Sequence, residues 1–381
     1  MGNEVVRHYT KIRGSWFVVC QLSLVLCLQR VSPILINSNL STDMTQTTPP
    51  SLTFRALRLL ADGEFRSGEE LARTLGVSRT TVWKALQNLE TWGVTLFKVH
   101  GRGYRLVTSV DWLERDQVER YIGPQASQFQ IHVVDSANST NDVLLSEALV
   151  GAPRGLTLAA ELQTQGRGRR GRVWHTGLGG ALTFSLLWRF EQGVAGLAGL
   201  GPAVSLALAR ALRILGVDEA MLKWPNDILW RHQKLAGVLV ELQGDAMGPS
   251  AAVIGIGINV RLEERVRSRI DQAVTDLASA GAPQSRNQIL GVVLGQLAAL
   301  LEQFAGTGFA GLKEEWDSYH ALAGRTVAVM LPDLSEHIGV AAGVGEDAAL
   351  LLQTASGLRR FHSGEVSLRP LESLQRRAGA A

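Results

Sequence analysis

The chain has 381 residues with 38 basic and 35 acidic side chains, so its formal net charge is +3. Its length predicts two or three domains, and a composition of 46% hydrophobic and 19% charged residues excludes a mostly disordered chain. No apolar run reaches the roughly 20 residues of a membrane-spanning helix. Both cysteines, Cys20 and Cys27, lie near the N-terminus, so the rest of the chain cannot form a disulfide. These features predict a cytoplasmic protein that binds no membrane.

The first 50 residues differ in pattern from the rest of the chain. Basic residues precede an apolar stretch from Trp16 to Leu28, which is typical of a secretory signal, but no small-residue cleavage site follows. The alternative is an over-long start, with Met44 as the natural first residue. We favour this alternative and expect residues 1–50 to be a non-native or disordered extension.

Local charge separates a small basic segment from a mildly acidic remainder. Residues 51–106 hold nine basic and five acidic side chains, a net charge of +4, whereas residues 107–381 have a net charge of −3. Basic modules of this size often bind the phosphate backbone of nucleic acids.

Two capped helices follow a first helix that begins near Leu52. Ser67 and Glu70 have the spacing of a capping box at the start of the second helix, and Gly76 is placed to end it. Ser78 caps a third helix that we expect over residues 79–90. Its buried stripe comprises Val82, Leu86 and Leu89. This pair of helices predicts a helix-turn-helix whose second member is the recognition helix.

Residues 94–106 predict a wing, because two short strand patterns flank a glycine-rich turn. We expect Trp83, on the recognition helix, to pack against this wing. The residues expected to contact DNA are Arg79, Thr80 and Lys84 at base edges and Lys98, Arg102 and Arg105 at phosphates. The alternative is a helical bundle that binds protein, but the caps, the wing and the local charge favour DNA.

From residue 107 the pattern is mixed α/β. The apolar segments predict strands at residues 130–134, 156–161, 182–188, 221–224, 236–242 and 252–260, and helices at residues 142–149, 201–215 and 287–304.

Residues 165–174, QGRGRRGRVW, carry the strongest chemical signal of the chain. Glycine lets a backbone approach a ligand closely, and guanidinium groups bind carboxylate and phosphate through paired hydrogen bonds. The segment therefore predicts a loop that closes over an anionic, phosphate-bearing intermediate. A solvated basic loop and a nucleic-acid patch are the alternatives. The segment lacks the Walker pattern of an ordinary phosphate-binding loop.

Two weaker motifs follow this loop. In residues 223–227, KWPND, the proline should interrupt a strand and turn Asn226 and Asp227 outward, and Lys234 opens the next strand with a charge. Gly255 and Gly257 would let a planar ring or a sugar lie against a strand, although simple sheet packing explains them equally well.

A polar cluster, Ser139-Thr140-Asn141, precedes the helix that is predicted at residues 142–149. The cluster either caps that helix or grips a small polar ligand.

Taken together, these motifs resemble the family of bifunctional biotin–protein ligases and biotin operon repressors. The resemblance covers about residues 52–370, and the motifs at residues 139–141, 166–172, 223–227, 234–241 and 255–259 follow the family's order. It implies an α+β fold with a winged helix-turn-helix at residues 51–108, a central mixed-sheet, class II synthetase-like ligase domain at residues 109–323, and a C-terminal SH3-like β-barrel with its tail at residues 324–381. Strand patterns at residues 326–330, 338–344, 350–354, 358–361 and 366–369 fit that barrel.

The resemblance implies a two-step reaction. Biotin and MgATP give biotinyl-5′-adenylate and pyrophosphate, and the adenylate then acylates a lysine of the biotin carboxyl carrier protein of acetyl-CoA carboxylase. The expected catalytic residues are Lys234, Arg167 and Arg169. The expected biotin-binding residues are Ser139, Thr140, Asn141, Gln163, Arg167, Gly168, Arg169 and Lys234. The expected nucleotide- and magnesium-binding residues are Asn226, Asp227, Gly237, Gly255, Gly257 and Asn259, with no metal built into the protein itself.

The resemblance also implies a second partner, the operator DNA of biotin synthesis genes, which a homodimer binds when the adenylate is present. This chain departs from the family at Val274, where characterised repressors carry a tryptophan against the adenine. That departure bears on the coupling between adenylate and dimerisation. The alternative functions are a lipoate- or octanoate-type ligase and a biotin ligase whose DNA-binding module is inactive.

Overall fold

The computed structural model describes residues 11–12, 15–16, 51–282, 285–331, 333, 335–362 and 367–370. Most of the predicted N-terminal extension lies outside the described residues. Its described part is a short ladder in which β1 (Lys11–Ile12) pairs antiparallel with β2 (Ser15–Trp16). Contacts divide the chain into two units, residues 1–39 and residues 40–381.

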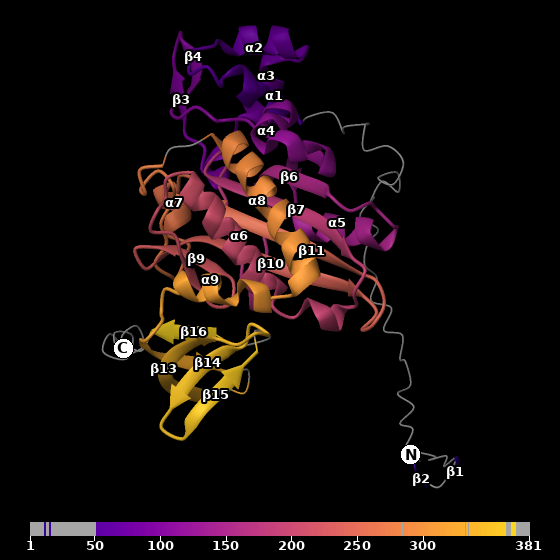
Figure 1. Cartoon of the computed structure of the whole chain (residues 1–381). Coiled ribbons are helices and arrows are strands. Elements are labelled where there is room, and N and C mark those ends of the chain that lie inside the picture. The colour runs from indigo at the N-terminus through magenta and orange to yellow at the C-terminus, as the bar shows by residue number, and fades with distance from the viewer. Residues whose placement is uncertain are drawn as a thin grey trace, which may run out of the picture. The chain divides into compact units, whose positions relative to one another are not determined.

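Short helices and a two-stranded wing form the N-terminal module, residues 51–106 (Figure 1). Its elements are α1 (Leu52–Leu59), α2 (Gly68–Leu75), α3 (Arg79–Ala85), the 3-10 turn η1 (Leu89–Trp92), β3 (Leu96–Val99) and β4 (Gly103–Leu106). The predicted ends of α2 are confirmed, because the Ser67 hydroxyl accepts a hydrogen bond from the backbone N–H of Glu70 and Gly76 has a φ of +69°. The Glu70 carboxylate pairs with Arg66 at 2.7 Å and does not complete a capping box.

The third helix is shorter than expected. We predicted it over residues 79–90, but α3 ends at Ala85. Asn88 adopts a left-handed conformation with φ of +59°, which a right-handed helix cannot continue through and which asparagine tolerates better than most residues. The predicted apolar stripe is nevertheless buried, because η1 turns Leu89 back into the core of the module.

The wing has a third, single-bridge partner besides β3 and β4. Arg66 and Tyr104 exchange backbone hydrogen bonds of 2.9 Å, so the segment before α2 lies along β4. Gly103 makes this approach possible, because a Cβ atom there would lie 2.1 Å from the Arg66 carbonyl oxygen. The α2 N-terminus is thereby fixed to the wing.

A seven-stranded mixed sheet forms the centre of the chain, in the order β5-β6-β7-β11-β10-β9-β8. Its strands are β5 (Gln130–Ala137), β6 (Leu156–Gln163), β7 (Ala181–Phe190), β8 (Met221–Lys223), β9 (Asp227–Trp230), β10 (Gln233–Gly244) and β11 (Ser250–Asn259). Only β5 and β6 pair in parallel among these strands. The six predicted strands are confirmed, and β9 was missed because four residues after a turn carry too weak a pattern.

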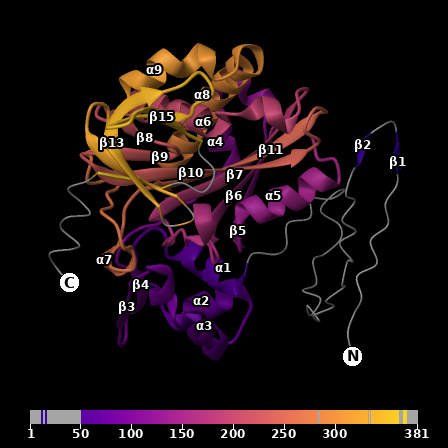
Figure 2. The ribbon, with the colours of Figure 1, turned by 90° about the horizontal axis from the view of Figure 1, so that it is seen from below.

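Helices cover the two faces of this sheet in different ways. Figure 2 shows α6 (Leu200–Ile214) and α8 (Arg286–Thr307) on one side of the sheet and α5 (Thr140–Leu149) on the other. Side chains alternate between these faces along each strand. In β7, Phe184 and Leu186 pack in the large core with α6 and α8, whereas Leu187 packs with α5. The remaining helical elements are α4 (Arg115–Ile122), η2 (Gly123–Gln128), η3 (Arg169–Gly171), η4 (Val194–Leu197), α7 (Glu264–Arg267), η5 (Ala310–Leu312) and α9 (Lys313–Ser318).

By length and composition, α8 is apolar enough to cross a membrane, which the sequence reading did not allow for. Its apolar side chains have a different explanation in this fold. Leu290, Leu297 and Phe304 are fully buried against the central sheet and α6. A helix that is buried on most sides needs an apolar surface whether or not it meets lipid.

A five-stranded antiparallel sheet follows, in the order β15-β14-β13-β12-β16. Its strands, all five of which were predicted, are β12 (Thr326–Met330), β13 (Glu336–Val344), β14 (Leu350–Thr354), β15 (Gly357–Phe361) and β16 (Ser367–Pro370). The indole N–H of Trp224 donates a hydrogen bond of 2.9 Å to the carbonyl of Ala348. This bond ties the second sheet to the segment that joins β8 to β9.

The N-terminal module shares its core with the central region. Leu162, at the end of β6, and Leu178 belong to the same buried cluster as the apolar residues of α1, α2 and α3. The segment that joins the N-terminal module to the central region, residues 107–114, lies beside a buried ion pair in which Arg286 is 2.6 Å from Glu161. Arg286 also donates to the carbonyl of Asp111, and Glu161 accepts from the backbone N–H of Leu113, so both side chains of the pair bond to that segment.

Candidate functional site

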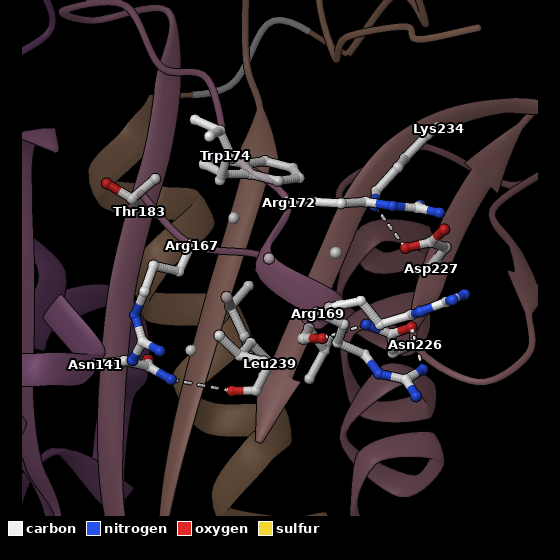
Figure 3. Close-up of a pocket in the computed structure, with 18 of the residues that line it drawn as sticks. Asn141, Arg167, Arg169, Arg172, Trp174, Thr183, Asn226, Asp227, Lys234 and Leu239 are labelled. Atoms are coloured by element: carbon white, nitrogen blue, oxygen red, sulfur yellow. Dashed lines mark hydrogen bonds and ion pairs between the residues drawn. The ribbon is translucent and has the colours of Figure 1, made fainter. Parts of the chain in front are cut away.

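One pocket gathers almost all of the predicted ligand residues. Its floor is the α5 side of β7, β10 and β11, and its rim is the arginine loop (residues 165–174) together with the turn between β8 and β9. The predicted residues that line it are Ser139, Thr140, Asn141, Gln163, Arg167, Gly168, Arg169, Asn226, Asp227, Lys234, Gly237, Gly255 and Gly257. Figure 3 shows Arg167 beside Asn141 on one side of the pocket and Lys234 beside Asp227 on the other.

The polar cluster before α5 does cap the helix, since the Ser139 hydroxyl accepts from the backbone N–H of Asp142. It also enters the pocket. The backbone N–H and the hydroxyl of Thr140 both lie within hydrogen-bond distance of Gln163 Oε1, at 2.8 and 3.1 Å. Ser185 Oγ is 2.7 Å from Thr140 Oγ1 and 2.6 Å from Asn141 Oδ1. The capping and ligand-gripping interpretations are therefore compatible in geometry.

Asn141 is held from three sides and is 4% exposed. Its Nδ2 lies 2.7 Å from Glu241 Oε2 and 3.3 Å from the Leu239 carbonyl, and its Oδ1 faces Ser185. Gly255 gives the amide its place, because a Cβ atom on residue 255 would lie 2.2 Å from Asn141 Oδ1. The group that lies against Gly255 in this structure is therefore the side-chain amide of Asn141, whereas a ring or a sugar was predicted there.

The arginine loop is ordered over the pocket by its own backbone. The N–H of Gly168 donates to the Arg172 carbonyl at 2.7 Å, and the N–H of Trp174 donates to the Gly166 carbonyl at 2.8 Å. Arg167 extends to the α5 end, where its Nη2 contacts the carboxylates of Asp142 and Glu241.

Arg169 projects from the same loop toward the β8–β9 turn. Its Nη1 donates to Asn226 Oδ1 at 3.1 Å. Burial lowers the pKa of the Arg169 guanidinium, Arg170 and Arg172 add to this effect, and Asp227 opposes it. Arginine stays protonated in proteins, so the loop delivers a partly desolvated cation to the turn.

Lys234 and Asp227 form the charged pair at the opposite end of the pocket. Lys234 Nζ lies 2.6 Å from Asp227 Oδ1, and both side chains are largely buried. Lys234 Nζ also lies 5.6 Å from the centre of the Trp174 ring. That indole rests on Gly257, where a Cβ atom would lie 2.4 Å from the ring. A planar ring therefore does lie against this strand, and in this structure it is the side chain of Trp174.

Asn259 is the predicted site residue that does not line the pocket. It is 2% exposed, and its Nδ2 donates to the carbonyl oxygens of Thr275 and Lys234 at 2.9 and 3.3 Å. Both amide hydrogens are therefore used by the backbone. Asn259 fixes the start of β10, which carries Lys234, and the prediction of a direct ligand contact is not supported by this position.

Among the described residues, no group of three or more His, Cys, Asp or Glu side chains is placed to hold a metal ion. Asp227 and Asn226 nevertheless offer carboxylate and amide oxygens at the rim. Such hard oxygen atoms suit Mg²⁺, which proteins usually bind through one or two carboxylates together with substrate phosphates. The residues present therefore fit a cation that arrives with a nucleotide.

Two family models match the chain. One, described as the Biotin/lipoate A/B protein ligase family, matches residues 133–259, and one described as an HTH domain matches residues 53–105. The Bifunctional ligase/repressor BirA of Escherichia coli (strain K12) is 36% identical over 322 residues, which cover 84% of this chain and 98% of that protein. The chain belongs to the family of bifunctional biotin ligase/repressors.

Two further matches cover about two thirds of this chain. The Biotin--[acetyl-CoA-carboxylase] ligase of Mycobacterium tuberculosis (strain ATCC 25618 / H37Rv) is 30% identical over 265 residues, covering 66% of this chain and 94% of that protein. Among solved structures, the biotin protein ligase from Aquifex aeolicus in complex with biotin and ATP has a TM-score of 0.55 and 29% identity, over 63% of this chain and 99% of that one.

Three residues that line the pocket of this ligase/repressor or contact its lining side chains were missed as site residues. Trp174 closes the arginine-loop motif, Glu241 closes the motif of residues 234–241, and both were read only as parts of those motifs. Ser185 gave a clearer signal, because it is a polar residue in the mostly apolar strand β7 and is fully buried. A buried polar group in such a run needs a hydrogen-bond partner and so points to a built site.

Of the six side chains predicted to contact DNA, five lie on the surface of the N-terminal module and Arg105 is half-buried. Arg79, Thr80, Lys84, Lys98 and Arg102 are all exposed. Arg102 and Arg105 stack on Phe65, with guanidinium carbons 4.2 and 4.9 Å from the ring centre. The expectation for Trp83 was wrong, because this side chain is 51% exposed and lies outside the buried cluster of the module.

Proposed function

We propose that the chain activates biotin with ATP to biotinyl-5′-adenylate and transfers the biotin to a lysine of the biotin carboxyl carrier protein of acetyl-CoA carboxylase. The observation that carries the proposal is the pocket itself. It joins a small polar end, which Thr140 and Gln163 line and where Ser185 contacts Thr140, to an end with two cations, Arg169 and Lys234. A ureido ring at the first end would place a carboxylate among the charges of the second.

The first step joins two anions. An oxygen of the biotin carboxylate attacks the α-phosphorus of ATP, the bond to the bridging oxygen breaks, and pyrophosphate leaves. Lys234, Arg167 and Arg169 can offset the charge that develops on the phosphoryl oxygens. Mg²⁺ would supply further charge neutralisation between the phosphates, held at Asp227 and Asn226. Because the carboxylate is the nucleophile, the step needs no nucleophilic side chain.

The second step uses the mixed anhydride. The neutral amine of the carrier lysine attacks the acyl carbon, the bond to the phosphate oxygen breaks, AMP leaves, and the amine loses a proton to become the amide. Between the two steps the anhydride must be kept from water. The arginine loop lies over the pocket and is the element of this chain that can exclude water there.

The substrate is tested by transfer to the purified carrier domain with ATP and Mg²⁺. We expect biotin to be transferred, and lipoate and octanoate to be poor substrates. Transfer of lipoate in preference to biotin would overturn the proposal in favour of the lipoate-type alternative.

A second function, repression of biotin synthesis genes, is favoured by a specific observation. The exposed face of α3 and the wing carries Arg79, Lys84, Lys98 and Arg102 on a module that matches an HTH domain model. We propose that a homodimer binds the operator DNA when the adenylate is present. A gel shift on the promoter of those genes, with and without biotin and ATP, tests this. Absence of a shift under both conditions would leave a ligase with an inactive DNA-binding module.

The same proposal divides the chain into three domains, a winged helix-turn-helix at residues 51–108, a class II synthetase-like ligase domain at residues 109–323 and an SH3-like domain at residues 324–381. The antiparallel order β15-β14-β13-β12-β16 supports the last of these. A cytoplasmic location fits both proposed partners, because the carrier protein and the chromosome lie there.

A further inference from the structure

The carboxylate of Glu241 is shared by two parts of the pocket that come from distant segments of the chain. Glu241 lies on the pocket face of β10 and is 26% exposed. Its Oε2 lies 2.7 Å from Asn141 Nδ2, at the start of α5, and 2.9 Å from Arg167 Nη2, in the arginine loop. One carboxylate oxygen therefore accepts hydrogen bonds from both segments.

Glu241 determines which way the Asn141 amide points. The nitrogen and oxygen of an amide are nearly equal in size, so their places are decided by the hydrogen-bond partners. Glu241 and the Leu239 carbonyl are acceptors and take the Nδ2 side, which leaves Oδ1 facing the hydroxyl of Ser185. Ser185 in turn lies 2.7 Å from Thr140 Oγ1. Glu241 therefore sets which atom donates and which accepts along the row of hydrogen bonds that runs from Asn141 through Ser185 to Thr140.

Glu241 also holds Arg167 at the α5 end of the pocket. The Nη2 of Arg167 donates to the carboxylate of Glu241 and forms an ion pair with that of Asp142. Within the part of the chain that the structure describes, no hydrogen-bond acceptor is found for the Nε and Nη1 groups of Arg167. A guanidinium held in this way keeps donors for an incoming anion.

We infer that Glu241 is a positioning residue for the proposed reaction. It fixes the Asn141 amide that orders the ring-binding hydroxyl groups, and it seats Arg167 so that the arginine loop rests over the pocket before any anionic intermediate forms. The inference rests on the proposed function, since biotin is the ligand whose ring and carboxylate the two ends would hold.

The test compares Glu241→Gln with the unaltered chain. A glutamine keeps the size of the side chain and one acceptor oxygen but carries no negative charge, so the hydrogen bonds from Asn141 and Arg167 are no longer charge-assisted. Calorimetry with biotin alone, without ATP, should show a Kd about tenfold higher, as expected for the loss of a charge-assisted hydrogen bond. Limited trypsin digestion should cut the arginine loop several-fold faster, since its four arginines are then less firmly seated.

Two further variants separate the roles of Glu241. Asp142→Asn removes a contact of Arg167 but none of Asn141, so it should speed tryptic cleavage with a smaller change in the biotin Kd. Glu302→Gln is the matched control, because Glu302 is an exposed carboxylate that pairs with Arg154 on the surface. It should change neither quantity. Thermal unfolding of each variant confirms that it is folded.

The outcomes distinguish this inference from the proposed function. Folded Glu241→Gln protein with the original biotin Kd and the original cleavage rate would overturn the positioning role. An equal rise of the Kd in Asp142→Asn would overturn the part of the role that runs through Asn141. Absence of biotin binding by the unaltered chain would overturn the proposed function, and the cleavage rates would still decide whether Glu241 seats the loop.

Discussion

At the scale of single residues, the pocket depends on glycines whose missing side chains leave room for other groups. Gly257 is in ordinary strand conformation, so its role is spatial. A Cβ atom there would lie 2.4 Å from the ring of Trp174, whereas one on Gly237 would meet Lys234 Cε at 3.2 Å. The first contact is with a rigid, half-buried ring and the second with a flexible side chain.

Gly257→Ala should therefore displace the Trp174 indole and with it the end of the arginine loop. A misplacement of about 1 Å at a reacting group can slow catalysis about a hundredfold. We expect adenylate formation, measured as pyrophosphate release with biotin and ATP, to fall by about tenfold or more. Gly306→Ala is the matched control and should leave the rate unchanged, because a Cβ atom on this residue of α8 meets nothing within 4 Å. Equal rates for the two variants would show that the indole is not held by Gly257.

The sequence predicted most of this pocket because its motifs are contiguous. Residues 165–174 and 223–227 carry their chemistry in adjacent positions, and composition alone marks them. The contact between Asn141 and Glu241 could not be predicted in that way. It depends on the strand order β7-β11-β10, which brings residues 100 positions apart into hydrogen-bond distance. Asn259 shows the opposite case, since its motif is contiguous but gives no sign that its side-chain amide bonds to the carbonyl oxygens of Thr275 and Lys234.

At the scale of elements, the wing presents its arginines on an aromatic support. Phe65, before α2, lies under Arg102 and Arg105, and Arg105 also lies 5.1 Å from the ring of Phe97. A guanidinium that stacks on a ring keeps its N–H edges outward, where phosphates can be reached. Phe65 thereby restricts two side chains that would otherwise lose entropy on binding DNA.

Phe65→Leu should weaken DNA binding about fivefold, since two exposed cation–π contacts together contribute about 1 kcal/mol. Phe65→Tyr keeps the ring and should restore the original affinity. The measurement is the Kd from fluorescence anisotropy with operator DNA at several salt concentrations. If leucine and tyrosine behave alike, packing rather than the aromatic face supports the wing.

A buried histidine follows α9 and links its end to β8. The backbone of Tyr319 and Ala321 bonds to Leu222, so His320 is drawn between these elements with 4% of its surface exposed. Its ring lies 5.0 Å from that of Trp316. Burial lowers the pKa of His320 to about 4, and Asp317 opposes this shift.

The folded protein should therefore lose stability as the pH falls from 6.5 to 4. In that window the unfolded chain binds a proton at residue 320 and the folded chain does not, so the free energy of unfolding falls as the pH falls. From pH 7.5 to pH 5 the loss through this group is about 2 kcal/mol. Urea unfolding at both pH values should show a loss smaller by about that amount in His320→Leu. An unchanged difference between the two pH values would place the acid sensitivity elsewhere.

The predictions of secondary structure were wrong where local sequence preferences and tertiary packing favour different conformations. The caps of α2 could be read from Ser67 and Gly76, because each acts on its own helix. The end of α3 could not, since the periodicity runs on to Leu89 while Asn88 takes a left-handed conformation that leads into η1. The short strand β9 depends on pairing with β8 and β10 and has little pattern of its own.

At the scale of the whole molecule, the N-terminal module abuts the segments that build the pocket. Arg58 of α1 lies 2.7 Å from Asp135 in β5, the strand that leads to Ser139 and Asn141. Leu162 of the shared core is followed directly by Gln163, whose amide oxygen accepts from Thr140. A DNA-binding module and a ligand-binding end therefore share one packed region.

Loss of the Arg58–Asp135 ion pair should affect both the N-terminal module and the ligand-binding end of the pocket. In Arg58→Ala, Asp135 is left largely buried without its cation, and the end of β5 loses a fixed point. We expect faster hydrogen exchange of the α1 amides and a biotin Kd raised about threefold, a change of the size that a partly exposed ion pair contributes. Arg73→Ala, an exposed arginine on α2, is the matched control and should change neither quantity. A faster exchange of α1 with an unchanged Kd would mean that the module docks on the pocket without supporting it, and DNA binding would then have no route to the ligand through this pair.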